Sequence, residues 1–378
     1  MKNLELENRK IKKKEKFLLN KSLIYIYFFL SFLSTYNISY KKDFLICITI
    51  LSFYFIIIFI LEIKRDKKIN FFMIFLILSL ILSLIFNISY LVYYLINISC
   101  IISCYIIAKL YKEYSLKIIF YLFSFFNFIN FNFYFFLDGN FANSKQICGI
   151  IIKRKFFSFL NLSTASTIAL FCIIISFFDK KYLKKYLKIF NIILSIYIIL
   201  STGKITVILC LIIIMIIIIS ENLIKKIKLF KAFIVTFLVL CFSSSLIFYL
   251  IKEYIPNLSN IFTGRTILWV DYWNYIISNK KNIFFGYGFF NNKISYLTHP
   301  HNQFLSIVYI LGILGAGLYF FIFYKALLVS YYQEKVIFYL LICMLVLMTG
   351  DDYFILTVFP IFSLVVFKAA FFLKNNKI

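Results

Sequence analysis

The sequence predicts an all-α polytopic membrane protein with about 12 transmembrane helices and one large external loop between the ninth and tenth helices. Hydrophobic residues make up 63% of the chain and its mean hydropathy is +0.94, whereas a soluble domain is roughly 45–50% apolar. The formal net charge of +26 comes from short lysine clusters between apolar runs, so a nucleic acid partner is not expected. Residues 1–378 are therefore expected to form a single integral membrane domain.

The apolar runs are near or somewhat below the roughly 17–25 residues that span a bilayer. The first run is expected to stay as a helix, because MKNLELENRKIKKKEK before it is too charged and too long for a cleavable signal. The seventh and eighth runs are short and only STGK at 201–204 separates them, so one long helix broken at Gly203 is an alternative. The runs are 21–37, 44–61, 71–87, 90–108, 117–137, 160–178, 189–201, 205–220, 232–251, 303–324, 336–350 and 354–373.

The distribution of basic residues predicts which side of the membrane each connecting segment occupies. With the N-terminus inside, the cytoplasmic segments hold 29 of the 41 Lys and Arg residues and the external segments hold 12. Cytoplasmic loops carry an excess of Lys and Arg. Both termini are therefore predicted to be cytoplasmic, and the segment 252–302 is predicted to be external.

The segment 252–302 contains most of the chemistry of the chain. It holds both histidines, both tryptophans and Arg265. Its middle, ILWVDYWNYII at 267–277, has apolar residues at helical spacing and predicts a short amphipathic helix in the headgroup region. A smaller external loop, 138–159, carries the turn signal DGN and then a basic KRK.

Two cations are candidates for binding phosphate. Arg265 follows Gly264, and a planar guanidinium grips phosphate with two parallel hydrogen bonds while glycine lets a ligand approach the backbone. Lys204 lies at the break between two short helices, beside Ser201 and Thr202, where broken helices often bind anions. The alternatives are that Arg265 pairs with lipid phosphate and that Lys204 extends to the membrane surface.

The motif HPHN opens the tenth run and supplies the candidate bases His299 and His301. Histidine suits proton transfer near neutral pH, and Asn302 is placed to orient an imidazole or a hydroxyl. Asp351 and Asp352 in the last external turn are candidates for steadying His301 or neutralising Arg265, or else form a solvated turn.

The remaining residues predict structure more than chemistry. Trp269 and Trp273 are compatible with sugar stacking, but aromatic residues are routine at membrane surfaces. The glycines after HPHN, including Gly312 and Gly317, are expected to permit close helix packing. The eight cysteines are scattered, without a CxxC or His/Cys cluster, so neither a metal nor a cofactor is expected.

This pattern resembles the O-antigen ligase and polymerase superfamily of bacterial envelopes over roughly 195–360. The resemblance rests on four features in family order: LSTGK at 200–204, TGRTILW at 263–269 with a following G-x-G, the helix opening HPHNQFLSIVYILGILG, and an acidic residue in the last external turn. The G-x-G is formed by Gly286 and Gly288.

The resemblance implies an enzyme of the bacterial inner (cytoplasmic) membrane. Such an enzyme transfers a glycan from an undecaprenyl diphosphate carrier to an acceptor hydroxyl on the external face, without metal or nucleotide sugar. It makes Arg265 and Lys204 the diphosphate grip and His301 the base. The family often has arginine where this chain has Lys204, and lysine lacks the bidentate fork. The implied partners are the lipid-linked glycan, membrane lipid and a chain-length regulator protein.

Within the superfamily, TGRTILW, FFGYGF and the modest external loop favour a polysaccharide polymerase over an O-antigen ligase. A lipid-linked glycan flippase or other transporter is the alternative from a different class. Transporters place charges within their spans, whereas the apolar runs here are nearly free of charge. The sequence therefore favours the enzyme.

Overall fold

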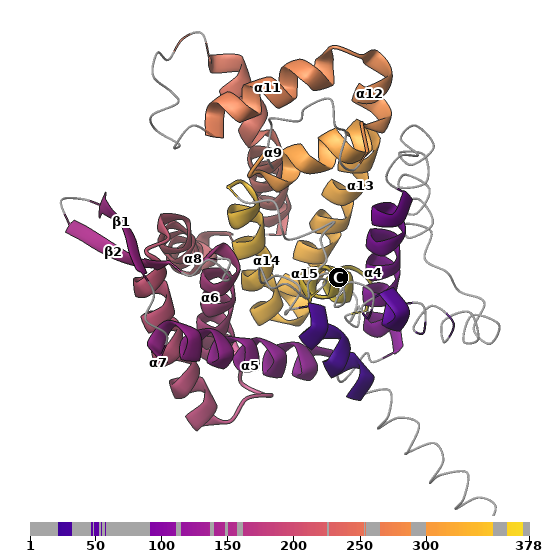
Figure 1. Cartoon of the computed structure of the whole chain (residues 1–378). Helices are drawn as coiled ribbons and strands as arrows, with labels where there is room; N and C mark the ends of the chain where they lie inside the picture. The colour runs from indigo at the N-terminus through magenta and orange to yellow at the C-terminus, as the bar shows by residue number, and fades with distance from the viewer. Residues whose placement is uncertain are drawn as a thin grey trace, which may run out of the picture.

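The computed structural model describes most of the second half of the chain and parts of the first (Figure 1). The predicted run 71–87 lies outside the described residues, and the run 44–61 lies mostly outside them. The described residues are 22–31, 47, 49–52, 54, 57, 91–110, 115–136, 140–147, 150–156, 162–224, 227–252, 254, 265–288, 300–350 and 361–372.

Helices make up nearly all of the described structure, as the hydrophobic runs predict. Among the described residues, three helices are long and apolar enough to span a membrane: Lys185–Thr202, Leu229–Ile251 and Gln303–Gln333. The other apolar helices are shorter, so the number of spans stays a prediction. The helices are α4 (Leu91–Leu110), α5 (Ser115–Phe136), α6 (Leu162–Phe178), α7 (Lys185–Thr202), α8 (Ile205–Ile224), α9 (Ile227–Ile251), α11 (Arg265–Ile277), α12 (Lys280–Phe285), α13 (Gln303–Gln333), α14 (Lys335–Met348), α15 (Ile361–Phe367) and the π-helix η3 (Lys368–Phe372).

One element departs from the all-α prediction. Strands β1 (Asn140–Ile147) and β2 (Ile150–Phe156) form an antiparallel hairpin within the segment expected to be a loop. The turn signal DGN at 138–140 reaches only the first residue of β1 and does not join the two strands. The hairpin was missed because its sequence, NFANSKQI followed by IIIKRKF, has no clear alternation of apolar and polar residues.

The helix boundaries differ from the hydrophobic runs where polar residues extend a helix. α7 and α8 are separate helices, because Gly203 adopts the left-handed conformation (φ 54°, ψ 35°) that ends α7. α13 continues to Gln333, nine residues past the end of the apolar run. The segment 325–335 is therefore mostly helix, and Lys325 lies within α13.

α14 lies at the centre of the bundle. Twelve of its residues are buried, including Val336, Phe338 and Met348, as expected for a helix that is apolar on all sides. Figure 1 shows α14 between α13 and α6, with α11 and α12 lying across the ends of α9 and α13. The centre of the bundle is thus a packed helix, which fixes the positions of both of its ends.

The two ends of α14 collect different segments. At the end near Lys335, this lysine pairs with Glu221 of α8, and Tyr339 packs its ring 4.4 Å from that of Phe178. At the other end, the carbonyl oxygens of Thr349 and Gly350 accept hydrogen bonds from side chains of the segment 252–302. We name these the Glu221 end and the Arg265 end. Segments that the charge count places on one membrane side are grouped at one end, although the side that each end faces stays a prediction.

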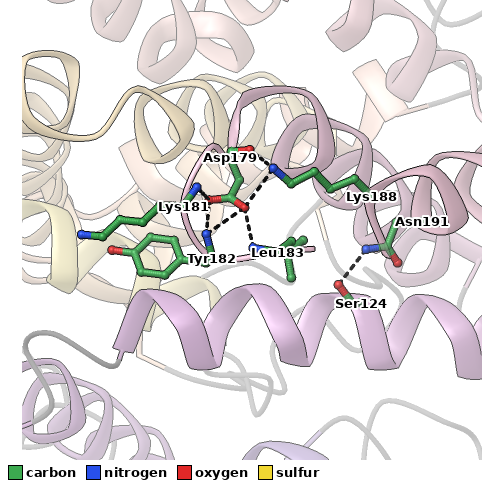
Figure 2. Close-up of polar contacts among 7 residues, drawn as sticks. All are labelled: Ser124, Asp179, Lys181, Tyr182, Leu183, Lys188 and Asn191. Atoms are coloured by element: carbon green, nitrogen blue, oxygen red, sulfur yellow. Dashed lines mark hydrogen bonds and ion pairs between the residues drawn. The ribbon is translucent and has the colours of Figure 1, made fainter. Parts of the chain in front are cut away.

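The turn between α6 and α7, at the Glu221 end, is organised by one buried carboxylate (Figure 2). Asp179 is 3% exposed and accepts hydrogen bonds from the backbone N–H groups of Lys181, Tyr182 and Leu183 at 2.7 to 3.2 Å. Its Oδ2 lies 3.5 Å from Nζ of Lys188. A buried charge is tolerated when it is paired and hydrogen-bonded in this way, so Asp179 is structural.

Candidate functional site

Asn302 connects three helices at the Arg265 end. It is the N-cap of α13, where its Oδ1 accepts from the backbone N–H of Leu305 at 2.9 Å. Its Nδ2 donates to the carbonyl oxygen of Thr349 at 3.1 Å and to Oγ of Ser244 at 3.2 Å. Asn302 is fully buried. Its side chain therefore ties the start of α13 to the end of α14 and to α9.

Arg265 is the first residue of α11 and reaches the same end of α14. Its Nη1 donates to the carbonyl oxygen of Gly350 at 2.6 Å. A cation at the C-terminus of a helix is favoured by the helix dipole. Within the described ranges no carboxylate pairs with Arg265, so most of its guanidinium donors remain for another acceptor.

The beginning of α8 meets Arg265 beside Gly350. The Cγ2 of Thr206 and the Nη1 of Arg265 both lie 3.6 Å from the position that a Cβ on Gly350 would occupy. Lys204 precedes α8 directly and is partly exposed. The sequence segments LSTGK and TGRTILW, which are far apart in the chain, therefore lie at one place in the fold.

The helix predicted within 267–277 is present as α11, and its apolar face is turned into the bundle. Nε1 of Trp269 donates to the carbonyl oxygen of Pro300 at 2.7 Å, and Nε1 of Trp273 donates to Oγ of Ser245 at 3.2 Å. The two indoles are 3% and 9% exposed. Both tryptophans are therefore anchors of α11, and sugar stacking on them is excluded by their burial.

α13 breaks at Gly312, and the segment after α12 fills the break. Gly312 has φ 69° and ψ −174° inside the helix. The backbone N–H groups of Tyr287 and Gly288 donate to the carbonyl oxygens of Tyr309 and Ile310, at 2.6 and 3.1 Å. In an unbroken helix these carbonyls would accept from residues 313 and 314.

Gly286 and Gly312 make this contact possible because neither has a side chain. A Cβ on Gly286 would overlap the carbonyl of Ile310, and a Cβ on Gly312 would overlap the carbonyl of Phe284. The rings of Tyr287 and Tyr309 stack beside the contact with centroids 5.3 Å apart. The G-x-G and the glycine of α13 thus hold α11 and α12, which carry Arg265, against the first half of α13.

His301 is held in an uncommon backbone conformation between two fixed residues. Its φ is 51°, and it is the one non-glycine residue with positive φ in the described part of the chain. The carbonyl oxygen of the preceding residue, Pro300, accepts a hydrogen bond from Trp269, and the following residue, Asn302, is the N-cap of α13. A non-glycine residue in this region costs about 1–3 kcal/mol and is frequent at functional sites.

The structure brings together Arg265, the start of α8 after Lys204, and the segment of His301 and Asn302. Four other predicted residues, His299, Gly264, Asp351 and Asp352, lie outside the described residues. Sequence reasoning missed the residues that complete the arrangement. These are Thr206, Ser244, Thr266, Thr349 and Gly350.

A weak signal for two of the missed residues is visible in the sequence. Thr206 follows Lys204 by two residues, and Thr266 follows Arg265 directly. A threonine beside a cation at a helix start is compatible with anion binding, although each instance alone is common. No comparable signal marks Ser244, because serines within apolar helices usually bond to their own backbone.

Comparison with known proteins covers the region of these contacts. The family model for O-antigen ligase, Wzy_C, matches residues 189–320. No curated protein and no solved structure matches the chain. The matched range contains Lys204, Arg265 and His301, and the match does not distinguish polymerases from ligases. Residues 189–320 are therefore similar to the O-antigen ligase family, which covers the part of the chain that contains these contacts.

Proposed function

We propose that this protein is a membrane glycosyltransferase of surface polysaccharide assembly that uses an undecaprenyl-diphosphate-linked glycan as donor. The observation that carries the proposal is the meeting of the family's separate segments at the Arg265 end. Arg265 donates a hydrogen bond to the carbonyl oxygen of Gly350, and Thr206 lies beside Gly350. Asn302 donates a hydrogen bond to the carbonyl oxygen of Thr349. Cations, helix starts and a histidine at one place are the groups that glycosyl transfer from a diphosphate requires.

The proposed reaction is a displacement at the anomeric carbon of the donor sugar. The oxygen of the acceptor hydroxyl forms a bond to this carbon while the bond from the carbon to the phosphate oxygen breaks. His301 takes the proton of the acceptor hydroxyl, and Arg265 with Lys204 stabilises the negative charge on the departing diphosphate. Asn302 acts by positioning, because its amide is occupied by Leu305, Thr349 and Ser244.

Polymerisation of repeat units is the favoured reaction, and transfer of finished polymer to lipid A core is the alternative. The sequence elements TGRTILW and FFGYGF support the polymerase. The segment between α9 and α13, residues 252–302, is also modest in length and includes the two short helices α11 and α12.

The Arg265 end is proposed to face the periplasm, with both termini in the cytoplasm. The charge count supports this orientation, and the fold is consistent with it because the lysine-rich segments around Lys181, Lys188 and Lys335 share the Glu221 end. The donor would then meet the site on the external face of the inner membrane.

The test is turnover by the purified full-length protein with lipid-linked repeat units in detergent. A polymerase should release undecaprenyl diphosphate and form products that increase by whole repeat units. A ligase should form product only when lipid A core is added. Movement of the donor across vesicles without either product would favour the transporter and contradict the proposed enzyme.

A further inference from the structure

Two buried threonine hydroxyls at the Arg265 end have no hydrogen-bond partner among the described residues. Thr266 is 2% exposed and its Oγ1 is unpaired. The Oγ1 of Thr206 is also buried and unpaired. The Cγ2 of the Thr206 side chain lies beside Gly350, whose carbonyl binds Arg265. The Thr206 side chain thus lies near the guanidinium, and Thr266 directly follows Arg265 in α11.

The two threonines occupy equivalent positions in their helices. Thr206 is the second residue of α8 and Thr266 is the second residue of α11, and a cation precedes each of them. The first N–H groups of a helix have no acceptor within the helix, and the helix dipole favours an anion there. Each helix therefore begins with a cation and a threonine hydroxyl close together in the chain, at the end that the helix dipole makes favourable for an anion.

The helical period fixes the face on which Thr266 lies. Residues three and seven positions later, Trp269 and Trp273, bond Pro300 and Ser245 in the bundle. Thr266 is on the same face of α11, and it is one turn nearer the end of α14. Thr266 is therefore turned toward the interior, away from the exposed side marked by Ile267.

Such an arrangement is unfavourable without a ligand. More than roughly 90% of buried polar groups in proteins have a hydrogen-bond partner, and leaving one unpaired is destabilising. The other unpaired side-chain atoms in the described part of the chain belong to Asn127, Asn130, Ser176 and Tyr319. Only Thr206 and Thr266 adjoin the two cations of the candidate site, which links their unpaired state to an anion.

We propose that the hydroxyls of Thr206 and Thr266 donate hydrogen bonds to phosphate oxygens of the donor diphosphate and so complete the anion site begun by Arg265. This inference rests on the proposed function. In the displacement, the electron pair of the broken bond between the anomeric carbon and the phosphate oxygen passes to that oxygen. The threonines keep their protons and form no covalent bond, and they stabilise the added charge.

The first measurement is the affinity of the purified full-length protein for inorganic pyrophosphate. Thr206→Val and Thr266→Val remove a hydroxyl with little change in shape, and each should weaken pyrophosphate binding by roughly tenfold, as for one lost hydrogen bond to a charged group. Thr206→Ser and Thr266→Ser should bind nearly as well as wild type. Orthophosphate should bind much more weakly, whereas a site for the single phosphate of a phospholipid headgroup would bind both equally.

The second measurement separates ligand binding from a structural role. Because the hydroxyls are unpaired in the free protein, both valine variants should unfold at the same temperature as wild type or higher. Ser176→Ala is the matched control, since Ser176 is a buried, unpaired hydroxyl on α6 near the Glu221 end. This control should change neither pyrophosphate binding nor turnover.

Two outcomes would overturn the inference in distinguishable ways. If Arg265→Ala weakens pyrophosphate binding but both valine variants bind like wild type, the threonines are not ligands and the proposed function stands. If the valine variants lose thermal stability and activity together, the hydroxyls are structural. Failure of the wild-type protein both to bind pyrophosphate and to turn over the donor would remove the proposed function itself.

Discussion

Arg265 and Gly350 are joined by a hydrogen bond of 2.6 Å between guanidinium Nη1 and a carbonyl oxygen, across 85 positions of the sequence. The bond attaches the start of α11 to the end of α14. It also restricts the orientation of the guanidinium, because Nη1 is held at one edge. The remaining donors are thereby oriented before a ligand arrives, which reduces the entropy cost of binding.

Replacing Arg265 should distinguish the contribution of its positive charge from that of its bidentate hydrogen-bonding geometry. Arg265→Ala should abolish turnover, and Arg265→Lys should leave a partial defect because an ammonium group cannot both hold Gly350 and bind phosphate in a fork. Lys280→Ala is the control, since Lys280 is an exposed cation in the same segment. Turnover is measured with purified protein, and normal product from membrane-inserted Arg265→Ala would refute the diphosphate grip.

Gly312→Ala should destabilise the protein by more than about 2 kcal/mol, from the strain of positive φ and the overlap with Phe284. Gly286→Ala should act alike through Ile310. Thermal unfolding in detergent measures the effect. Gly317→Ala on the same helix meets no atom within 4 Å and should raise stability by up to about 1 kcal/mol. Equal effects at the two α13 glycines would show that the contact between α12 and α13 is unimportant.

His301 offers a test in which stability and activity move in opposite directions. His301→Gly should raise thermal stability by about 1 kcal/mol, because glycine adopts φ 51° without strain. The same change should lower turnover by roughly 10²–10⁴-fold, as for a missing general base. His301→Asn keeps tolerance for positive φ and should also be inactive.

His299→Ala is the comparison for these variants and should lose less activity. Gel analysis of cells separates the two reactions. A His301→Ala strain should display lipid A core plus one repeat unit if the enzyme is a polymerase, and bare core if it is a ligase. A normal polysaccharide ladder from the His301→Ala strain would show that His301 is not the base and has a structural role.

The turn between α13 and α14 should make stability depend on pH. Burial raises the pKa of Glu334 above 4.5, and nearby Asp179 raises it further while Lys181 lowers it. The folded state therefore binds the proton more tightly than the unfolded state, so this contribution to stability is complete below pH 4.5 and is lost as pH rises through the raised pKa. Glu334→Gln should flatten this part of the profile of unfolding temperature against pH, and an unchanged slope would contradict the assignment.

Reporter fusions test the orientation of the bundle. A reporter that is active only outside the cytoplasm should be active when fused after Asn291 and silent when fused after Lys228. The reason is the excess of Lys and Arg on cytoplasmic segments. Reversed signals would place the Arg265 end in the cytoplasm, away from the proposed donor.

Much of the helical order follows from hydrophobic runs, because a buried or lipid-facing helix needs a continuous apolar surface. The break at Gly203 was visible as a short polar interruption. The break at Gly312 was not, because its neighbours Leu311 and Ile313 are as apolar as the rest of the run. Its cause is tertiary, since Gly286 and Tyr287 occupy the gap.

The candidate site, like the fold, could be predicted only in part from the sequence. Residue type and position identified Arg265, Lys204 and His301, because Arg265 is the one arginine of the segment 252–302, Lys204 lies at a break between two apolar runs, and the chain has two histidines. Periodicity could not reveal that Thr349 and Gly350 would accept hydrogen bonds from distant side chains, since backbone carbonyls carry no sequence signal. The unpaired state of Thr206 and Thr266 also requires coordinates, because it depends on what each hydroxyl fails to reach.

The bond from Trp269 to the carbonyl of Pro300 and the bond from Gly288 to Ile310 have a consequence for divergence among relatives. They anchor the chain on both sides of the segment 289–299. Loop-closure cost rises by only about 0.6 kcal/mol for each doubling of length. Insertions and exchanges between these two anchors are therefore expected to leave Arg265 and Asn302 in their places, which makes 289–299 a natural junction for chimeric proteins.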